Sequence, residues 1–294
     1  MPDRARASNA RIHTVKPPIR LLAVDIDGTL LDRQFQISSA NLSALRHAHE
    51  AGVEVVLVTG RRHQFAMPVA QALGFDLWLI SSNGAVTRSS QSEPFHRDLL
   101  PAETAHKVCR LMDDFRGNLV LIFDREGKGA LVLERVDELT TTIQRWVESN
   151  LQFIEFVVPI ERSLDTDPVQ AMFCGSIAHM TQAEERLRAA HLEGLVTVLK
   201  TTYAFRDLTI VDVLNHGCSK GHALERWTRH RGFRREQVMA IGDNYNDIEM
   251  LEFAGVPVIM GNAPDDLKQN GWSATLSNEH SGVAAAVEQF LLSS

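Results

Sequence analysis

The chain carries, from Ile19 to Thr29, the sequence IRLLAVDIDGT, in which a nearly continuous apolar run meets two acidic residues and a glycine. Apolar runs of this kind are typical of strands that are covered on both faces, as in a parallel sheet. Asp25 and Asp27 come directly after the predicted strand. In open α/β sheets ligands bind outside the carboxyl ends of the strands, so these two acids stand where a site would form.

Strands and helices alternate over most of the chain, on both sides of a middle segment. Helices are expected between the strands, one from Ser38 or Ser39 to Gly52, one that ends at Gly74, and one from Lys220 to about residue 230. This alternation predicts an α/β fold with a Rossmann-like, doubly wound parallel-sheet core. The core strands are predicted at residues 19–24, 53–58, 77–80, 237–241 and 256–260.

The middle segment has a different pattern. Residues 119–123 and 130–133 flank a turn with two glycines, which predicts a β-hairpin. Residues 205–213 predict the last strand of the segment. Its helices are predicted near residues 102–115, 139–149 and 181–191. The mixture indicates an α+β domain inserted into the first one.

These patterns divide the chain into three parts. The first 18 residues carry four basic residues and no apolar stretch, so a disordered basic tail is predicted at 1–18. The core domain is predicted at 19–86 and 215–294. The inserted α+β domain is predicted at 87–214.

Composition and charge exclude several classes of protein. The 294 residues carry a formal net charge of −7, which disfavours binding to a nucleic-acid backbone. No apolar run is long enough to span a membrane, and no secretory signal is expected. The three cysteines are widely separated and show no metal-ligand or redox spacing, which predicts reduced thiols and a cytoplasmic location.

Asp25 and Asp27 form a pair of acids that suits catalysis. On an extended chain, side chains two residues apart share a side, with Cβ atoms roughly 6–7 Å apart. At an effective dielectric near 20, two carboxylates at that range repel by about 2–3 kcal/mol. A bound cation or a proton on one carboxyl relieves this repulsion. A phosphatase uses both, because one carboxylate attacks phosphorus and the other moves a proton.

Polar residues also follow the other predicted strands. Thr59 and Asn83 end two of them, and the stretch from Asp243 to Asp247 follows a third. Mg²⁺ prefers oxygen ligands, so carboxylates from two strand ends plus a phosphate suit it. Thr59 offers a hydroxyl and a backbone N–H to a phosphoryl oxygen. Lys220 opens a helix, where a phosphate gains from backbone N–H groups and from the ammonium.

Each of these residues also has an ordinary structural explanation. Asp27-Gly28 is a common turn pair, Thr59 is a β-branched strand terminator, Asp247 suits the start of a helix, and a lysine such as Lys220 usually lies on the surface. Chance explains one polar strand end more readily than several.

Taken in order, four stretches resemble the four motifs of the haloacid dehalogenase superfamily. The match to its Cof-type branch lies in Asn83-Gly84-Ala85, in 260–263 and in 282–284. The resemblance covers nearly the whole chain after residue 18. One departure is that residues 214–216 replace the proline that usually precedes the lysine motif. The four motifs are DIDGT at 25–29, VTGR at 58–61, SKG at 219–221 and GDNYND at 242–247.

The resemblance implies a set of roles. It makes Asp25 the nucleophile and Asp27 the general acid and base. It implies a Mg²⁺ site formed by Asp25, Asp243, Asp247 and the backbone carbonyl of Asp27. It also implies that the segment inserted after Asn83 is a cap that closes over the site. The implied substrate- and phosphate-binding residues are Gly28, Thr59, Gly60, Arg61, Asn83, Lys220 and Asn246, of which Thr59 and Lys220 orient the phosphate, and Asn246 and Asp247 position Lys220 and the metal's waters.

We therefore expect a Mg²⁺-dependent phosphatase that hydrolyses a small phosphorylated metabolite, a sugar phosphate or similar, through an aspartyl-phosphate intermediate. A phosphomutase acting at the same site and a non-catalytic phosphate-binding regulatory module are the alternatives. A P-loop or dinucleotide enzyme lacks its sequence fingerprint. Neither nucleic acid nor a membrane is an expected partner, and the sequence does not specify the oligomeric state or the metabolite.

Overall fold

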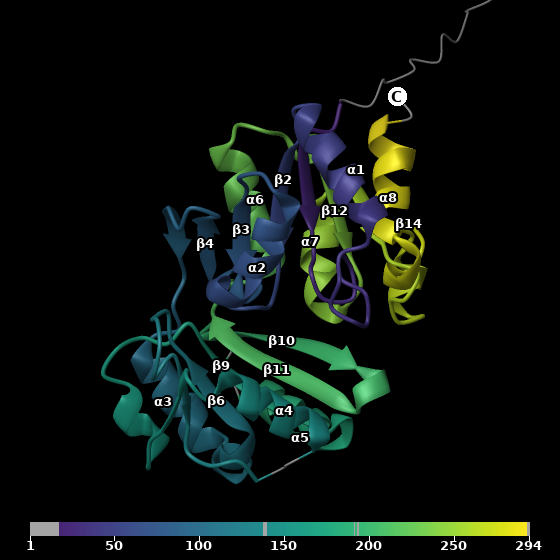
Figure 1. Ribbon diagram of the computed structural model, residues 1–294. Coiled ribbons are helices and arrows are strands. Elements are labelled where there is room, and N and C mark those ends of the chain that lie inside the picture. The colour runs from purple at the N-terminus through teal and green to yellow at the C-terminus, as the bar shows by residue number, and fades with distance from the viewer. Residues whose placement is uncertain (1–17, 138–139, 191, 193, 293–294) are drawn as a thin grey trace, which may run out of the picture.

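The computed structural model describes residues 18–137, 140–190, 192 and 194–292 (Figure 1). The predicted tail lies outside the described residues except for Pro18. The described chain forms two β-sheets, each with its own helices, which Figure 1 shows one above the other. The predicted α/β fold with a largely parallel core sheet is confirmed.

The first sheet has eight strands in the order β14-β13-β12-β1-β2-β3-β4-β5. Strands from β14 to β3 are parallel, and β4 and β5 are antiparallel additions at one edge. The predicted domain limit at residue 86 falls at the start of β4, whereas β4 and β5 both pair with the core sheet. The strands are β1 (Leu21–Val24), β2 (Glu54–Val58), β3 (Trp78–Ser81), β4 (Val86–Ser89), β5 (Pro94–Arg97), β12 (Val238–Gly242), β13 (Val256–Ile259) and β14 (Ser273–Ala274).

Helices cover both faces of this sheet, which explains the continuous apolar runs. In β1, Leu22 and Val24 pack with α1, α2 and α8, whereas Leu21 and Ala23 pack with α6 and α7. All four side chains are fully buried. The helices are α1 (Ser39–Glu50), α2 (His63–Leu73), α6 (Lys220–His230), α7 (Ile248–Phe253) and α8 (Gly282–Val287).

The second sheet lies within the predicted inserted domain and has the order β10-β11-β9-β6-β7-β8. All its neighbours are antiparallel except β7 and β8. Buried residues of α3 and α5 form its main core. The elements are β6 (Leu119–Ile122), β7 (Leu131–Leu133), β8 (Ile154–Phe156), β9 (Gln170–Gly175), β10 (Val196–Tyr203), β11 (Leu208–Asn215), α3 (Ala102–Leu111), α4 (Thr141–Asn150) and α5 (Ile177–Ala189).

Several strands were not predicted, among them β10, and one predicted strand was placed too early. The predicted strand 205–213 is β11, which begins at Leu208, and β10 precedes it as the other half of a hairpin. A short 3-10 helix and Asp207, with a positive φ of 45°, turn the chain between them. β10 reads VTVLKTTY and is mostly half-buried, so it lacks the apolar run that marks the core strands.

Two further predictions concern membrane-spanning helices and disulfides. No helix among the described residues is long and apolar enough to cross a membrane. None of the three cysteines, all of which lie among the described residues, forms a disulfide.

Candidate active site

The polar strand ends meet at one edge of the core sheet. β1 pairs in parallel with β12 and with β2, so Asp25, Asp243 and Thr59 follow neighbouring strands. The Asp25 N–H still donates to Ile241 (3.0 Å), which continues the ladder up to the acid. Gly28, at φ +85°, then turns the chain back. A Cβ at Gly28 would lie 2.3 Å from Oδ2 of Asp243, so only glycine fits beside this carboxylate.

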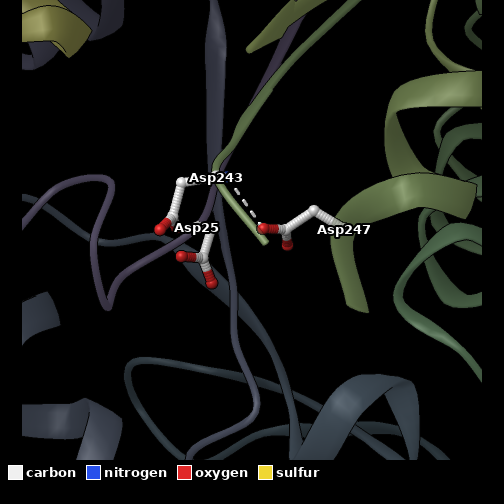
Figure 2. A group of neighbouring side chains, drawn as sticks. All are labelled: Asp25, Asp243 and Asp247. Atoms are coloured by element: carbon white, nitrogen blue, oxygen red, sulfur yellow. Dashed lines mark hydrogen bonds between the residues drawn. The ribbon is translucent and has the colours of Figure 1, made fainter. Parts of the chain in front are cut away.

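Three buried carboxylates form the centre of the site (Figure 2). Asp25, Asp243 and Asp247 each offer an oxygen within 4.8 Å of the others. Asp247 begins the turn into α7 and accepts the backbone N–H groups of Asp243 (2.9 Å) and Asn244 (3.0 Å). The loop therefore holds its own acids in place, as the dashed line in Figure 2 shows for Asp243 and Asp247.

Lys220 lies among these acids. It opens α6 and is 1% exposed, and its Nζ donates to Asp25 Oδ1 (2.6 Å) and to Asp247 Oδ1 (2.7 Å). Burial opposes the charged ammonium, but attraction to Asp247 and Asp25 prevails, so the pKa of Lys220 is raised. Lys220 is thus a fully charged bridge between two strand ends, and the surface-lysine explanation is excluded.

The acids carry more negative charge than Lys220 offsets. Burial raises the pKa of Asp25 to about 7; the nearby Lys220 opposes the shift and the charge of Asp247 adds to it. Burial, followed by repulsion from Asp25 and Asp247, also holds the pKa of Asp243 well above its usual range. Three carboxylates face one ammonium, which leaves an excess of negative charge that a divalent cation would neutralise. The oxygen-only donor set fits Mg²⁺.

Asp27 stands apart from this group. Its carboxylate forms a two-pronged ion pair with Arg61, with Nε to Oδ2 at 2.7 Å and Nη2 to Oδ1 at 2.6 Å. Both side chains are about a quarter exposed. The part of Asp27 that the resemblance assigns to the metal is its backbone carbonyl, which stays a prediction.

The Thr59 loop lies next to the site. The Thr59 N–H donates to Ile80 (2.8 Å), so the predicted use of this N–H for phosphate was wrong: the sheet takes it, and the hydroxyl is the donor that is left. That hydroxyl oxygen accepts the N–H of Arg61 (3.1 Å). Gly60 packs against Asn83, whose Oδ1 would lie 3.1 Å from an added Cβ.

Asn83 connects the core with the second sheet. It holds a positive φ of 52°, which asparagine tolerates, and its Nδ2 donates to Asp212 of β11 (2.8 Å). Its Oδ1 accepts from Asn246 (2.9 Å), so the described contact of Asn246 is with Asn83 rather than with Lys220. A phosphate-binding role for Asn83 and Asn246 stays a prediction.

Several residues of the site were not found from the sequence. Thr29 donates its hydroxyl to Asp243 (2.9 Å), and Asn262 donates to the same carboxylate (3.3 Å). Tyr203, at the end of β10, lies near the site carboxylates: its pKa is raised well above the usual value, first by burial and then by Asp27 and Asp243. The position of Thr29 within DIDGT was a sequence signal that could have identified it. Tyr203 lies in β10, a strand that the sequence pattern did not predict.

The second sheet is fastened to the loop that carries Asp243. Asn244 donates its Nδ2 to the Thr202 carbonyl (3.1 Å) and accepts the Thr202 N–H on Oδ1 (3.3 Å). These two bonds place the next residue, Tyr203, beside the core site.

Comparisons with known proteins agree with this geometry. A family model described as haloacid dehalogenase-like hydrolase matches residues 22–287. Phosphatase YwpJ of Bacillus subtilis (strain 168) is 29% identical over 294 residues, which cover 93% of this chain and 100% of that protein. Pyridoxal phosphate phosphatase YbhA of Escherichia coli (strain K12) is 29% identical over 252 residues, 85% of this chain and 90% of the relative. A solved haloacid dehalogenase-like hydrolase from B. subtilis superposes with a TM-score of 0.77 at 26% identity, over 93% of this chain and 100% of its own.

Fold, site and comparisons define a hydrolase with an α/β fold, whose clustered polar groups lie at the carboxyl ends of a largely parallel sheet. The chain belongs to the haloacid dehalogenase-like hydrolase family. It is a phosphatase of that superfamily, of the Cof type, and the resemblance seen in its four motifs is confirmed.

Proposed function

We propose that the chain is a Mg²⁺-dependent phosphatase that hydrolyses a small phosphorylated metabolite in two steps through Asp25. The observation that carries the proposal is the position of Asp25: it is buried with Asp243 and Asp247, and its Oδ1 lies 2.6 Å from Lys220. Among the described residues its other oxygen, Oδ2, has no hydrogen-bond partner, so it is available to a phosphorus atom.

In the first step Asp25 Oδ2 forms a bond to phosphorus, and the bond from phosphorus to the leaving oxygen breaks. The leaving oxygen takes a proton from Asp27. In the second step a water oxygen bonds to phosphorus, gives its proton to Asp27, and releases phosphate and the Asp25 carboxylate. Mg²⁺ held by Asp25, Asp243 and Asp247 would offset the carboxylate charge and polarise the phosphoryl oxygens.

Asp27 has to change partners between these steps. Both carboxylate oxygens of Asp27 accept hydrogen bonds from Arg61 in the structure, so the side chain is held as an acceptor there. For the first step the carboxyl turns away from Arg61 and carries its proton to the leaving group. Lys220 and the Thr59 hydroxyl orient the phosphoryl oxygens.

The inserted domain, residues 87–214, acts as the cap in this proposal. Support comes from β10, whose Thr202 is bonded to Asn244 and whose Tyr203 lies near the site carboxylates. A cap that covers the site limits substrates to small molecules. The relative YbhA, named a pyridoxal phosphate phosphatase, supports a small phosphorylated metabolite as the substrate class.

The test is turnover of a generic aryl phosphate with Mg²⁺ and with a chelator, in the wild type and in Asp25→Asn. We expect phosphate release that the chelator abolishes and that Asp25→Asn lacks, while the variant stays folded. Release of free phosphate into water, rather than its transfer to a second sugar hydroxyl, separates a phosphatase from a phosphomutase. Full activity of Asp25→Asn would contradict the covalent route.

A further inference from the structure

A cavity of about 190 Å³ lies on the boundary between the two sheets. One wall is the first turn of α2, and the other is the loop that follows β6. None of the site acids Asp25, Asp27, Asp243 and Asp247 lines it, so the cavity is distinct from the candidate active site. The polar residues of its lining that matter are Arg62, His63, Ser82, Arg88, Asp124 and Arg125.

Arg62 is a cation without an anion. Its Nη2 is buried and has no hydrogen-bond partner, and the described residues provide it with no ion pair. The guanidinium faces the rings of Phe65 (4.5 Å) and Phe153 (5.1 Å) instead. Burial lowers the pKa of Arg62 to about 10. A desolvated charge left unpaired costs free energy, so proteins pair such groups or use them.

His63 adds two more unused polar atoms. Both of its ring nitrogens are buried without a hydrogen-bond partner. Burial, and then the charge of Arg88, lowers the pKa of His63, whereas Asp124 opposes the shift. The imidazole therefore stands ready to donate one hydrogen bond, or two if an anion raises its pKa.

The start of α2 also contributes backbone N–H donors to this cavity. Arg62 is the N-cap of this 11-residue helix and provides no side-chain cap. The N–H groups of His63 and Gln64 have no acceptor among the described residues. The positive end of the helix dipole thus adds to the charge of Arg62.

The remaining charges of the lining do not cancel this field. Asp124 is already paired with Arg88 (2.6 Å) and with Arg97 (2.9 Å). Arg125 stacks on the ring of Phe123 at 4.2 Å, in the same loop. Three arginines and two carboxylates, Asp124 and Glu126, line the cavity, which leaves a net positive charge in the lining.

We propose that this cavity binds an anionic group, a phosphate or a carboxylate, through Arg62, His63 and the free N–H groups at the start of α2. The site does not depend on the reaction at Asp25. The anion has two sources: a free anion that binds beside the core, or a second charged group on the substrate itself. The two sources differ in their experimental signature.

The first arm of the test follows His63 by NMR in the full chain during a titration with sulfate, against chloride at equal ionic strength. His63→Gln assigns the signal. Sulfate is expected to raise the pKa of His63 in the wild type. In Arg62→Met, which keeps the apolar contact with Phe65 and Phe153, sulfate should bind about tenfold or more weakly. Arg62→Lys should retain part of the affinity.

Arg229→Met is the matched control, because Arg229 lies on α6 with a side chain that is 76% exposed. In Arg229→Met, sulfate should raise the pKa of His63 as it does in the wild type. The second arm compares kcat/KM for phosphate monoesters that differ only in a carboxylate on the leaving group. A preference for the carboxylate that Arg62→Met lowers about tenfold would identify the anion as part of the substrate.

Sulfate binding without such a preference would identify a free anion instead, and either result supports the site. The proposal is overturned if His63 responds to sulfate no more than to chloride and Arg62→Met leaves the substrate preference unchanged. Because the sulfate arm needs no turnover, its result is readable even if the proposed phosphatase reaction fails.

Discussion

Replacing Asp212 by asparagine should remove a pH-dependent loss of stability. Asp212 lies on β11 and is 4% exposed, and it accepts hydrogen bonds from Asn83 (2.8 Å) and Gln170 (2.6 Å). Burial raises its pKa to about 7, against the hydrogen bond from Asn83 and the attraction of Lys220. The folded state therefore binds a proton that the unfolded chain, with a carboxyl pKa near 3.9, has already lost.

The sign follows from this difference. The contribution of Asp212 to stability is fully present below pH 4 and is lost as the pH rises to about 7. A shift of about three units at ~1.4 kcal/mol each amounts to roughly 4 kcal/mol. Asp212→Asn stays neutral throughout. Gln170 Oε1 is buried and unpartnered, so a flip of that amide gives the new NH₂ group an acceptor.

The assay is urea unfolding of both proteins between pH 5 and pH 8, with Mg²⁺ present to suppress the parallel titration of Asp25. Relative to the wild type, the free energy of unfolding of Asp212→Asn should rise by about 2.5–3 kcal/mol between pH 5 and pH 8, because only about two of the roughly three pH units between the two pKa values fall in this range. Asp165→Asn, at an exposed carboxylate, is the control and should not change the slope. If the difference in free energy of unfolding between Asp212→Asn and the wild type does not change with pH, that result refutes the reasoning.

Three further substitutions test separate contacts. Lys220→Met leaves its two buried carboxylate partners unpaired, so metal-free protein should lose about 3–5 kcal/mol of stability in denaturant unfolding at pH 8; an unchanged midpoint would contradict the buried bridge. Gly28→Ala places a Cβ 2.3 Å from Asp243 and strains a positive φ, so we expect a cost of about 1–3 kcal/mol and weaker Mg²⁺ binding by calorimetry, and native affinity would count against the close approach. Asn244→Ala removes both bonds to Thr202, so amide exchange in β10 should speed up by about tenfold or more, whereas exchange at the native rate would show that these bonds do not hold the cap.

The core strands and most of the acid cluster could be predicted because burial on both faces produces apolar runs that end abruptly. Asp25 and Asp243 follow such runs directly, and the parallel pairing of β1 with β12 brings them together. The buried ion pairs of Lys220 were harder to predict, because the sequence around a lysine at the start of a helix is the same whether its side chain is buried or exposed.

The cap contacts could not be predicted for a physical reason. β10 is half-buried and carries lysine and threonines, so no pattern distinguished it from a loop. Tyr203, the last residue of β10, therefore reached the site by tertiary packing alone. The partner of Asp27 was also hidden, since only the folded loop brings Arg61 within 2.6 Å of its carboxylate.

Calorimetric titration with Mg²⁺ of the wild type, Asp243→Asn and Asp27→Asn is the most direct test of the shared metal site. Asp243 is one of the three clustered carboxylates, whereas the Asp27 side chain is bound to Arg61 and only its backbone carbonyl is assigned to the ion. We predict one ion per chain in the wild type and in Asp27→Asn, with affinity weakened at least about tenfold in Asp243→Asn. Native Mg²⁺ affinity in Asp243→Asn would contradict the account.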